Sequence, residues 1–566
     1  MTSDEEKNNS NPSVHNGGSP EKYMGDNTDL ANGHNIDNAD GLHRLLNNRQ
    51  IQLVAIGGSI GTALFVSIGG GLARGGPLGL FLAYTIYSGI LALVNNGIAE
   101  MTTYMPVSGG FIRLAGHWAD DALGFMAGWN FFLYEGLLIP FEITAINLVL
   151  SYWSEDITKP GPTAGICIAI IICYAALNIL AVKAYGEAEF WLSGGKVILI
   201  LILFSFTFIT MVGGNPQGDA YGFRYWKNPG LFSNVYGNSG LGRFEGFLAA
   251  LWNAGFTVVG PEYISMVSAE AKRPSVYIKA AFKTVYYRFC FFFITGALAV
   301  GIVVPWNYQN LVDIFVTGSE GSGTAAASPY VMAMDILGVD VLPHIVNALL
   351  LTSIFSAGNT YTYCATRSLY GLALEGRAPS ILRKTTASGV PIYCFCVVML
   401  FPMLSFLQTS SGSAKVLNWL IALMTAGGLI NYLVMGLTYV NFYRACKAQN
   451  VDRRNMPYYA RFQPYCAYIG LAFQFCVVMC YGYKSFQPWD TELFFQNYTM
   501  QFVAPALFIF WKLYKKTRWL RPHEVDLVWE RPIIDSYENS ITTPPTGFWQ
   551  EMGMLIGIKA KVHSDE

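Results

Sequence analysis

Charged residues are scarce in this 566-residue sequence. Only 13% of the residues are Asp, Glu, Lys or Arg, whereas 52% are hydrophobic; an ordinary soluble domain carries about 25% charged residues. A soluble chain of this length would form several domains with polar surfaces, and this one has too few charges to coat them. Because 36 basic residues balance 37 acidic ones, nucleic acid is not an expected partner. The composition indicates a membrane protein whose main partner is the lipid bilayer.

Clusters of reactive side chains are also missing from the sequence. The ten cysteines lie in or beside apolar runs, and none forms a spaced pair in a long polar loop. Neither a disulfide framework nor a metal site is therefore indicated. The seven histidines are scattered and form no His/Asp cluster of the kind that a membrane enzyme would need. We expect no metal, no cofactor other than a coupling proton, and no enzymatic activity.

The N-terminal segment lacks the apolar run of a signal peptide. Ser, Asn, Asp, Gly and Glu dominate its first forty or so residues, a composition typical of disorder. We expect residues 1–45 to form a disordered tail on the side of synthesis, residues 46–520 to form the membrane domain, and residues 521–566 to form a second tail.

Apolar runs of about 20 residues, the length that crosses a bilayer core, occur roughly twelve times. They are 51–73, 78–102, 122–151, 163–183, 191–213, 246–267, 286–305, 343–372, 391–409, 416–440, 463–484 and 498–514. The sequence therefore predicts an all-α polytopic membrane protein of about twelve transmembrane helices. An even number of spans places both tails on one side of the membrane.

Basic residues between the predicted spans indicate which side this is. Lys and Arg gather between spans six and seven, eight and nine, and ten and eleven, and after the last span, whereas residues 289–366 contain neither. Since positively charged loops stay cytoplasmic, we expect both tails in the cytosol. The tail lysines (Lys7, Lys22, Lys559 and Lys561) are candidate ubiquitination sites that ubiquitin-ligase adaptors would serve.

Spans one and six contain residues that interrupt helices. Three glycines and two hydroxyl residues occur within residues 57–62, and span six contains Gly255, Gly260 and Pro261. Glycine costs a helix about 1 kcal/mol relative to alanine, and proline removes a backbone donor. The glycines of span one would also suit close helix packing. Two interrupted spans at matching positions of two halves, however, are typical of secondary transporters built from inverted repeats.

Such a pair of breaks suits a small zwitterion. Backbone freed from helical pairing is tolerated within the membrane only where it lines a cavity or binds something. The N-terminus of a half-helix offers N–H groups and positive potential to a carboxylate, while freed carbonyls accept hydrogen bonds from an ammonium group. The pattern therefore favours an α-amino acid as ligand.

Four ionisable residues lie within the predicted spans and are functional candidates because charge is expensive there. They are Glu135 and Glu142 in span three, Lys196 in span five and Glu262 in span six. Burial favours the neutral form of carboxyl and amine groups, so these groups suit proton exchange near neutral pH. Glu135 beside an aqueous vestibule, Lys196 snorkelling at the interface and Glu262 capping freed amides are the structural alternatives. Glu100, at a span end, is expected to be solvated.

Eight short segments carry a resemblance to known proteins. They are 49–62 (RQIQLVAIGGSIGT), 106–111 (PVSGGF), 128–130 (GWN), 140–142 (PFE), 186–191 (GEAEFW), 270–271 (EA), 356–361 (SAGNTY) and 367–373 (RSLYGLA). Through these segments the sequence resembles, in the same order from about residue 45 to 520, the fungal amino acid permeases, the yeast amino acid transporter family of the amino acid–polyamine–organocation superfamily.

This resemblance implies a five-plus-five inverted-repeat, LeuT-like fold with two extra C-terminal helices. Repeat one would cover about 51–213, repeat two about 246–440, and the extra helices about 463–514. It implies proton-driven amino acid uptake by alternating access at the plasma membrane, with the vacuolar membrane as the less favoured place.

The resemblance also assigns roles to particular residues. It places the substrate at the two breaks, links Glu142 to proton coupling or recognition, matches Lys196 to a lysine at the sodium position of ion-coupled relatives, and packs Ser353 and Ser356 of span eight against span one. Together with the charges within the spans, it predicts proton coupling at Glu142, Lys196 and Glu262. The predicted substrate-binding residues are Ser59, Ile60, Gly61, Thr62, Ala63, Phe256, Thr257, Val258 and Val259, and the predicted supporting residues are Glu135, Ser353, Ser356 and Asn359.

Several residues near the implied site depart from the family pattern. Ala63 replaces the usual Gly, Gly-Pro-Glu at 260–262 replaces Gly-Thr-Glu, and Asn431-Tyr432 replaces a Thr-Trp or Ser-Trp pair. Substrate preference therefore does not carry over, and a permease for polyamine or carnitine stays open. A non-transporting amino acid sensor of the same fold is the other alternative, although known sensors carry longer N-terminal extensions.

Overall fold

The computed structural model describes residue 44 and residues 46–180, 182–317, 328–386, 390–542 and 544–555. The predicted N-terminal tail up to residue 43 and the four candidate ubiquitination lysines lie outside these residues. Within them the secondary structure is helical, apart from the isolated bridges Leu46–Ala271 and Phe486–Trp489. The predicted all-helical class is therefore confirmed.

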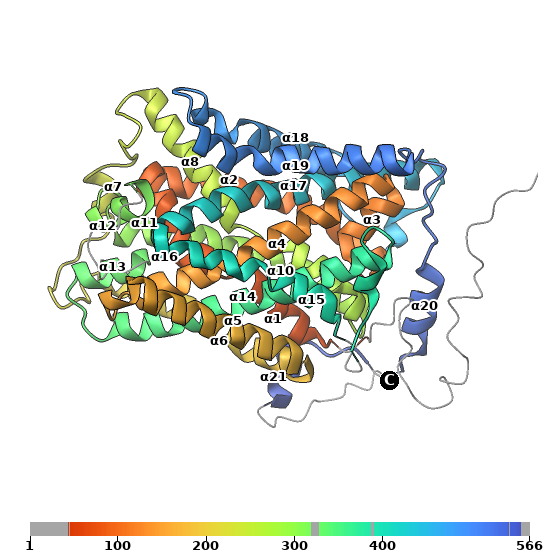
Figure 1. Ribbon diagram of the computed structural model, residues 1–566, viewed down its shortest axis with the longest axis horizontal. Coiled ribbons are helices and arrows are strands. Elements are labelled where there is room, and N and C mark those ends of the chain that lie inside the picture. Colours follow the sequence, from red (N-terminus) through yellow and green to blue (C-terminus); the bar gives the residue numbers. More distant parts are fainter. Residues whose placement is uncertain are drawn as a thin grey trace, which may run out of the picture.

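The helices follow one another through the whole described chain (Figure 1). The α-helices are α1 (Asn48–Ser59), α2 (Ile68–Tyr104), α3 (Gly110–Trp118), α4 (Asp121–Leu150), α5 (Pro160–Leu180), α6 (Val182–Met211), α7 (Arg224–Lys227), α8 (Gly240–Thr257), α9 (Pro261–Met266), α10 (Pro274–Arg288), α11 (Thr295–Val303), α12 (Gln309–Val312), α13 (Pro329–Ile336), α14 (Leu342–Leu374), α15 (Ile392–Val398), α16 (Gln408–Ser411), α17 (Ser413–Ala448), α18 (Tyr465–Cys480), α19 (Thr491–Lys515), α20 (Arg531–Ser540) and α21 (Phe548–Leu555).

Nine helices of the described residues are long and apolar enough to cross a membrane. They are Ala63–Tyr104, Asp121–Leu150, Pro160–Ile179, Trp191–Met211, Pro274–Val303, Ile392–Ser410, Lys415–Ala448, Tyr465–Ser485 and Thr491–Lys515. The first covers parts of two predicted spans, because α2 turns at Gly76, where φ is 73° and ψ is 173°. Spans one and six are interrupted, and α14 falls outside this apolar set. The count of twelve and the inverted repeat stay predictions.

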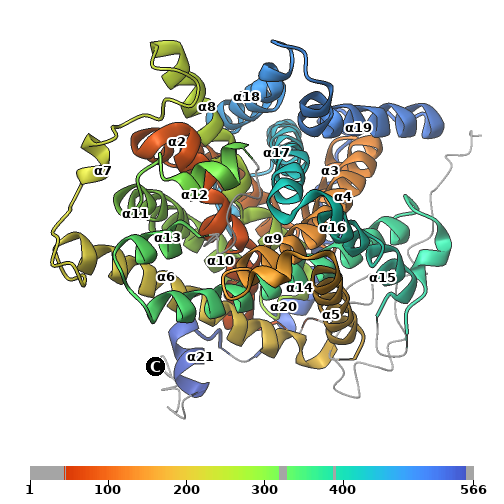
Figure 2. The same cartoon turned by 60° about the vertical axis from the view of Figure 1, so that its left-hand side comes forward.

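Helix α4 lies at the centre of the bundle, and α18 and α19 lie at its edge (Figures 1 and 2). In its most apolar stretch, α4 has 83% of its residues buried, compared with 22% for α19. Helices α14 and α17 pack directly on α4, and α2 packs on α8. Glycine permits part of this close approach: a β-carbon at position 136 would lie 2.9 Å from the ring of Phe401. The core therefore positions α4 between α14 and α17, two helices that contribute to the candidate site.

The chain after α19 folds back onto one end of the bundle. We call residues 519–542 and 544–555 the C-terminal strap, and the end of the bundle that they cover the tail face. The strap inserts the buried side chains of Val525, Leu527 and Ile534, and the indole of Trp118 donates to the Asp526 carbonyl over 3.0 Å. Farther along, Glu551 accepts a hydrogen bond of 2.8 Å from the Arg49 backbone N–H. The second tail therefore packs against the helices over most of its described length.

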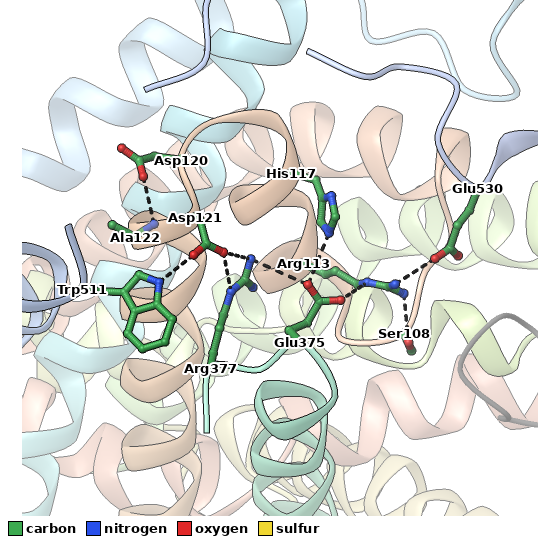
Figure 3. A network of polar contacts seen from close by, with 10 residues as sticks. All are labelled: Ser108, Arg113, His117, Asp120, Asp121, Ala122, Glu375, Arg377, Trp511 and Glu530. Atoms are coloured by element: carbon green, nitrogen blue, oxygen red, sulfur yellow. Dashed lines mark hydrogen bonds and ion pairs between the residues drawn. The ribbon is translucent and has the colours of Figure 1, made fainter. Parts of the chain in front are cut away.

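Paired charges cover the tail face (Figure 3). Glu375 contacts Arg113 of α3 at 2.6 Å and His117 at 3.3 Å, while Arg113 also reaches Glu530 of the strap at 2.9 Å. Arg377 pairs with Asp121 at the start of α4 at 2.7 Å. These pairs join the ends of α3, α4 and α14 to the strap.

The expectation for Glu100 is wrong. Its side chain is buried, and its two oxygens contact the guanidinium of Arg453 at 2.6 and 2.7 Å. The Tyr439 hydroxyl and the Ala460 N–H also donate to it. A partner distant in sequence, rather than water, compensates this carboxylate.

Candidate functional site

The first break interrupts span one at residues 60 and 61. Helix α1 ends at Ser59, Ile60 has extended dihedral angles (φ −111°, ψ 98°), and a π-helical turn begins at Ala63. Gly61 lies where a side chain would crowd its neighbours: a β-carbon there would lie 3.2 Å from the Ala357 β-carbon and 3.3 Å from Glu142 Oε1. The small residue therefore lets α4 and α14 approach the unwound backbone.

The second break interrupts span six at residues 258–260. Helix α8 ends at Thr257, Val258 is extended, and α9 begins at Pro261. Gly260 has φ 148° and ψ −40°, a conformation that only glycine adopts readily. Its N–H donates to Glu262 Oε2 over 3.1 Å. Glu262 therefore caps an amide that the break sets free, which was one of its two predicted roles.

The two breaks lie side by side. A β-carbon at Gly260 would lie 3.6 Å from that of Ser59, and Gly58 packs against the ring of Tyr263. Beyond the break, Asn253 of α8 donates to the Ser67 carbonyl over 2.8 Å and also lies 2.8 Å from the hydroxyl of Tyr84. Spans one and six are thus joined above and below their unwound segments.

Glu142 and Lys196 both reach span one. Thr62 donates its hydroxyl to Glu142 Oε2, and the Thr62 backbone N–H also acts on this carboxylate, as does the charge of Lys196. Lys196 donates to the Gly57 carbonyl over 2.8 Å, and both charged side chains are about 1% exposed. The alternative that Lys196 snorkels to an interface therefore does not describe this structure. The Glu142 carboxylate therefore lies at the N-terminus of the second half of span one.

Glu135 and Glu262 form a second pair of buried charged residues. Both side chains are buried, and Glu262 acts electrostatically on Glu135. The Tyr432 hydroxyl of α17 lies 2.9 Å from each oxygen of Glu262. Within the described part of the chain, neither oxygen of Glu135 has a hydrogen-bond partner. Three of the four predicted buried charges are thus acidic.

The remaining predicted residues lie at or near the breaks, with one exception. Phe256 meets Phe141 of α4 edge-on, with 5.4 Å between ring centroids. Ser353 and Ser356 are buried on α14, the helix whose Ala357 faces Gly61. Asn359 points away to α5, where it accepts a hydrogen bond of 2.9 Å from Asn178. The other predicted binding residues, Ile60, Thr257, Val258 and Val259, are also buried.

Sequence reasoning missed several residues of this region. Tyr84, Tyr263 and Tyr361 are buried around the breaks, and Asn253, within predicted span six, was not among the predicted site residues. Their signal was the number of tyrosines inside apolar runs, because a buried tyrosine hydroxyl requires a partner. The described residues contain no cluster of His, Cys, Asp and Glu suited to a metal ion.

Known proteins share most of this chain. A family model described as amino acid permease matches residues 50–524. The chain is 44% identical over 507 residues to the general amino acid permease AGP2 of Saccharomyces cerevisiae, covering 88% of this chain and 83% of that protein. It is 35% identical to the dicarboxylic amino acid permease of the same yeast (88% and 81% covered) and 35% identical to a proline-specific permease of Emericella nidulans (90% and 92% covered). The matched stretch includes both breaks and all four buried charges.

Proposed function

The chain belongs to the amino acid permease family, and from this premise we propose that it is a proton-coupled symporter that imports amino acids by alternating access. The observation that carries the proposal is the contact between the two interrupted spans, where Gly260 of span six lies against Ser59 at the end of α1, with buried charges nearby. Paired breaks of this kind are the binding sites of secondary transporters.

The substrate's α-carboxylate would bind at the N-terminus of the second half of span one. There the Thr62 N–H and hydroxyl, which now hold Glu142, are suited to an anion because of the half-helix dipole. The α-amino group would bind carbonyls of the span-six break, beside Phe256 and Thr257. Residues Ser59 to Ala63 and Phe256 to Val259 would thus read the part that all α-amino acids share.

Proton coupling follows from competition for these donors. Two carboxylates at one half-helix N-terminus repel each other in a poorly solvated site. Arrival of the substrate carboxylate would displace Glu142 from Thr62 and favour its protonated, neutral form. Lys196 would keep span one in place through the Gly57 carbonyl, and Glu262 would perform the matching role at span six. Release of substrate to the cytosol would return Thr62 to Glu142 and set the proton free.

The proposed membrane arrangement combines the structure with the sequence. Twelve spans, a LeuT-like five-plus-five repeat and two additional helices (α18 and α19) would place the tail face in the cytosol. The buried breaks would then lie near the middle of the bilayer, closed to both sides. The proposed location is the plasma membrane, with regulation through ubiquitin-ligase adaptors acting on the tails.

Uptake measurements test this function. The full chain would be expressed in a permease-deficient yeast and given each of the twenty amino acids, spermidine and carnitine as radiolabelled probes. We expect at least one amino acid to accumulate against its gradient and a protonophore to abolish the accumulation. Accumulation that resists the protonophore would contradict coupling. Binding without accumulation would instead favour the sensor, and uptake of spermidine or carnitine alone would move the substrate class.

A further inference from the structure

Glu135 is the most poorly compensated charge near the breaks. It lies in α4, its side chain is 0% exposed, and neither carboxylate oxygen accepts a hydrogen bond from any described residue. An uncompensated carboxylate in an apolar interior destabilises a folded protein. A ligand that binds only part of the time would explain such a group.

A tyrosine hydroxyl is the donor nearest to this carboxylate. The hydroxyl of Tyr263 in α9 approaches Glu135 without reaching hydrogen-bonding geometry. On α17, Asn431 precedes Tyr432, whose hydroxyl contacts Glu262, and Asn431 Nδ2 has no hydrogen-bond partner within the described residues. Tyr263 and Asn431 are each 1% exposed. Glu135 therefore has a neutral hydroxyl nearby and no cation to compensate its charge.

The charge around this point has a single sign. Glu262 is the charged residue that acts on Glu135, and across the described chain neither carboxylate forms an ion pair with Lys, Arg or His. Lys196 acts instead on Glu142. Two carboxylates that share a poorly solvated space repel each other, and a bound positive charge would compensate both.

Aromatic rings complete the surroundings. Tyr134, Tyr263 and Tyr361 interact electrostatically with Glu135, and Tyr432 binds Glu262. Tyrosine faces attract ammonium groups, and the effect grows when the cation is desolvated. We call Tyr134, Glu135, Glu262, Tyr263, Tyr361 and Tyr432 the acidic cluster.

We propose that the acidic cluster binds a second positive charge of the substrate, so that the transported molecule is an organic cation such as a basic amino acid. Glu135 is the residue that specifies this charge. The inference rests on the proposed function, because the breaks bind the zwitterionic end while the cluster, with residues on α4, α9, α14 and α17, receives the other end.

A matched pair of substrates tests the inference. Lysine and norleucine have side chains of similar length, and norleucine lacks the terminal ammonium. We expect the full-length protein to take up lysine at least about tenfold better than norleucine, and Glu135→Gln to remove that preference, because a buried charge pair contributes this much or more. Glu492→Gln is the control: it makes the same chemical change on the exposed first turn of α19 and should leave the ratio unchanged.

Each outcome has a distinct meaning. Equal or better uptake of norleucine by the unmodified protein overturns the inference but not the proposed transport. An unchanged ratio of lysine to norleucine uptake in Glu135→Gln has the same meaning. If neither amino acid accumulates but other amino acids do, the inference alone fails. If no amino acid accumulates, the transport proposal fails. The melting temperature of the purified protein, measured with and without lysine, then tests cation binding by the acidic cluster on its own. A stabilising shift with lysine that Glu135→Gln removes supports a cation-binding cluster, and its absence overturns one.

Discussion

Two regions of this protein bury acidic side chains in opposite ways. On the tail face and beside it, Glu100 has Arg453, Tyr439 and a backbone amide as partners, and Glu375 has two arginines and a histidine (Figure 3). At the breaks, Glu262 has a tyrosine and backbone amides but no cation, while both oxygens of Glu135 lack a hydrogen bond of good geometry within the described chain.

The difference indicates two roles for a buried acidic side chain: holding helices in one arrangement, or remaining available to bind a ligand or a proton. A buried charge with several fixed partners keeps neighbouring helices in one arrangement, because moving either helix exposes an unpaired charge. A buried charge with few partners is ready to exchange them for a ligand or a proton, at the expense of stability. The ion pairs of the tail face are therefore suited to hold the helices in place. The breaks instead resemble a site whose contacts change during a transport cycle.

The largest expected effect follows from replacing Glu142 by glutamine. The amide keeps the size of the side chain and a hydrogen-bonding atom for Thr62, but it cannot carry a proton between the two sides. We expect concentrative uptake to fall by at least about a hundredfold, since general acid–base groups contribute that much. Uptake assays combined with surface labelling measure this. Normal accumulation at normal surface abundance would remove Glu142 from the coupling mechanism.

Breaking the Glu100–Arg453 ion pair should instead affect stability. Arg453→Met leaves Glu100 buried without its cation, and removal of one partner of a buried pair costs about 3–5 kcal/mol. We expect a clear fall in the melting temperature of the purified protein. Adding Glu100→Gln to Arg453→Met should restore most of the loss, because no unpaired charge then remains. At the breaks the sign is opposite, since Glu135→Gln without ligand should leave the melting temperature unchanged or raise it.

The C-terminal strap gives a smaller effect of the same kind. Ile534 is 1% exposed where α20 packs on the bundle, and truncating a buried isoleucine to alanine costs about 2–3 kcal/mol. We expect a lower melting temperature for Ile534→Ala. Ile533→Ala is the matched control, because its neighbour in the same helix is exposed and should change little. A greater loss for Ile533→Ala would mean that α20 packs by its other face.

The sequence predicted the two helix breaks better than the buried ion pairs, for a physical reason. Gly61, Gly260 and Pro261 interrupt helices by local backbone chemistry, so their neighbours in sequence suffice to locate them. Glu100 looked solvated because its partner, Arg453, lies 353 residues farther along the chain. The pairing of such distant side chains depends on how helices pack, which composition and periodicity do not specify.

The candidate site shows the same division. The charges of Glu142 and Lys196 were identified because any charge within an apolar run is unusual. Their neighbours Tyr84 and Tyr361 were not, because a tyrosine in a span is common and its orientation depends on tertiary contacts. Asn359 lay in a diagnostic motif yet faces α5, which shows that a motif places a residue on a helix without fixing the face that it occupies.

The smallest expected effect concerns how the stability supplied by the tail-face ion pairs changes at low pH. Burial would raise the pKa of Glu375, but the hydrogen bond with His117 and the charges of Arg113 and Arg377 outweigh it and lower the pKa to about 2. Because the folded-state pKa is depressed, the stabilisation from Glu375 is fully present above the ordinary glutamate pKa of about 4.3. It is lost only as the pH falls from there toward 2. Glu375→Gln should therefore lower the free energy of unfolding above about pH 5 by about 1.5–3 kcal/mol, the range for hydrogen bonds to a charged group, and with it the melting temperature. Below about pH 4 the difference between the two proteins should begin to shrink, and they should converge only near pH 2. A difference that already shrank between pH 8 and 6 would show that the protonation of a carboxyl group on the tail face changes near neutral pH, as proposed for Glu142 at the breaks, and the contrast between the two regions would fail.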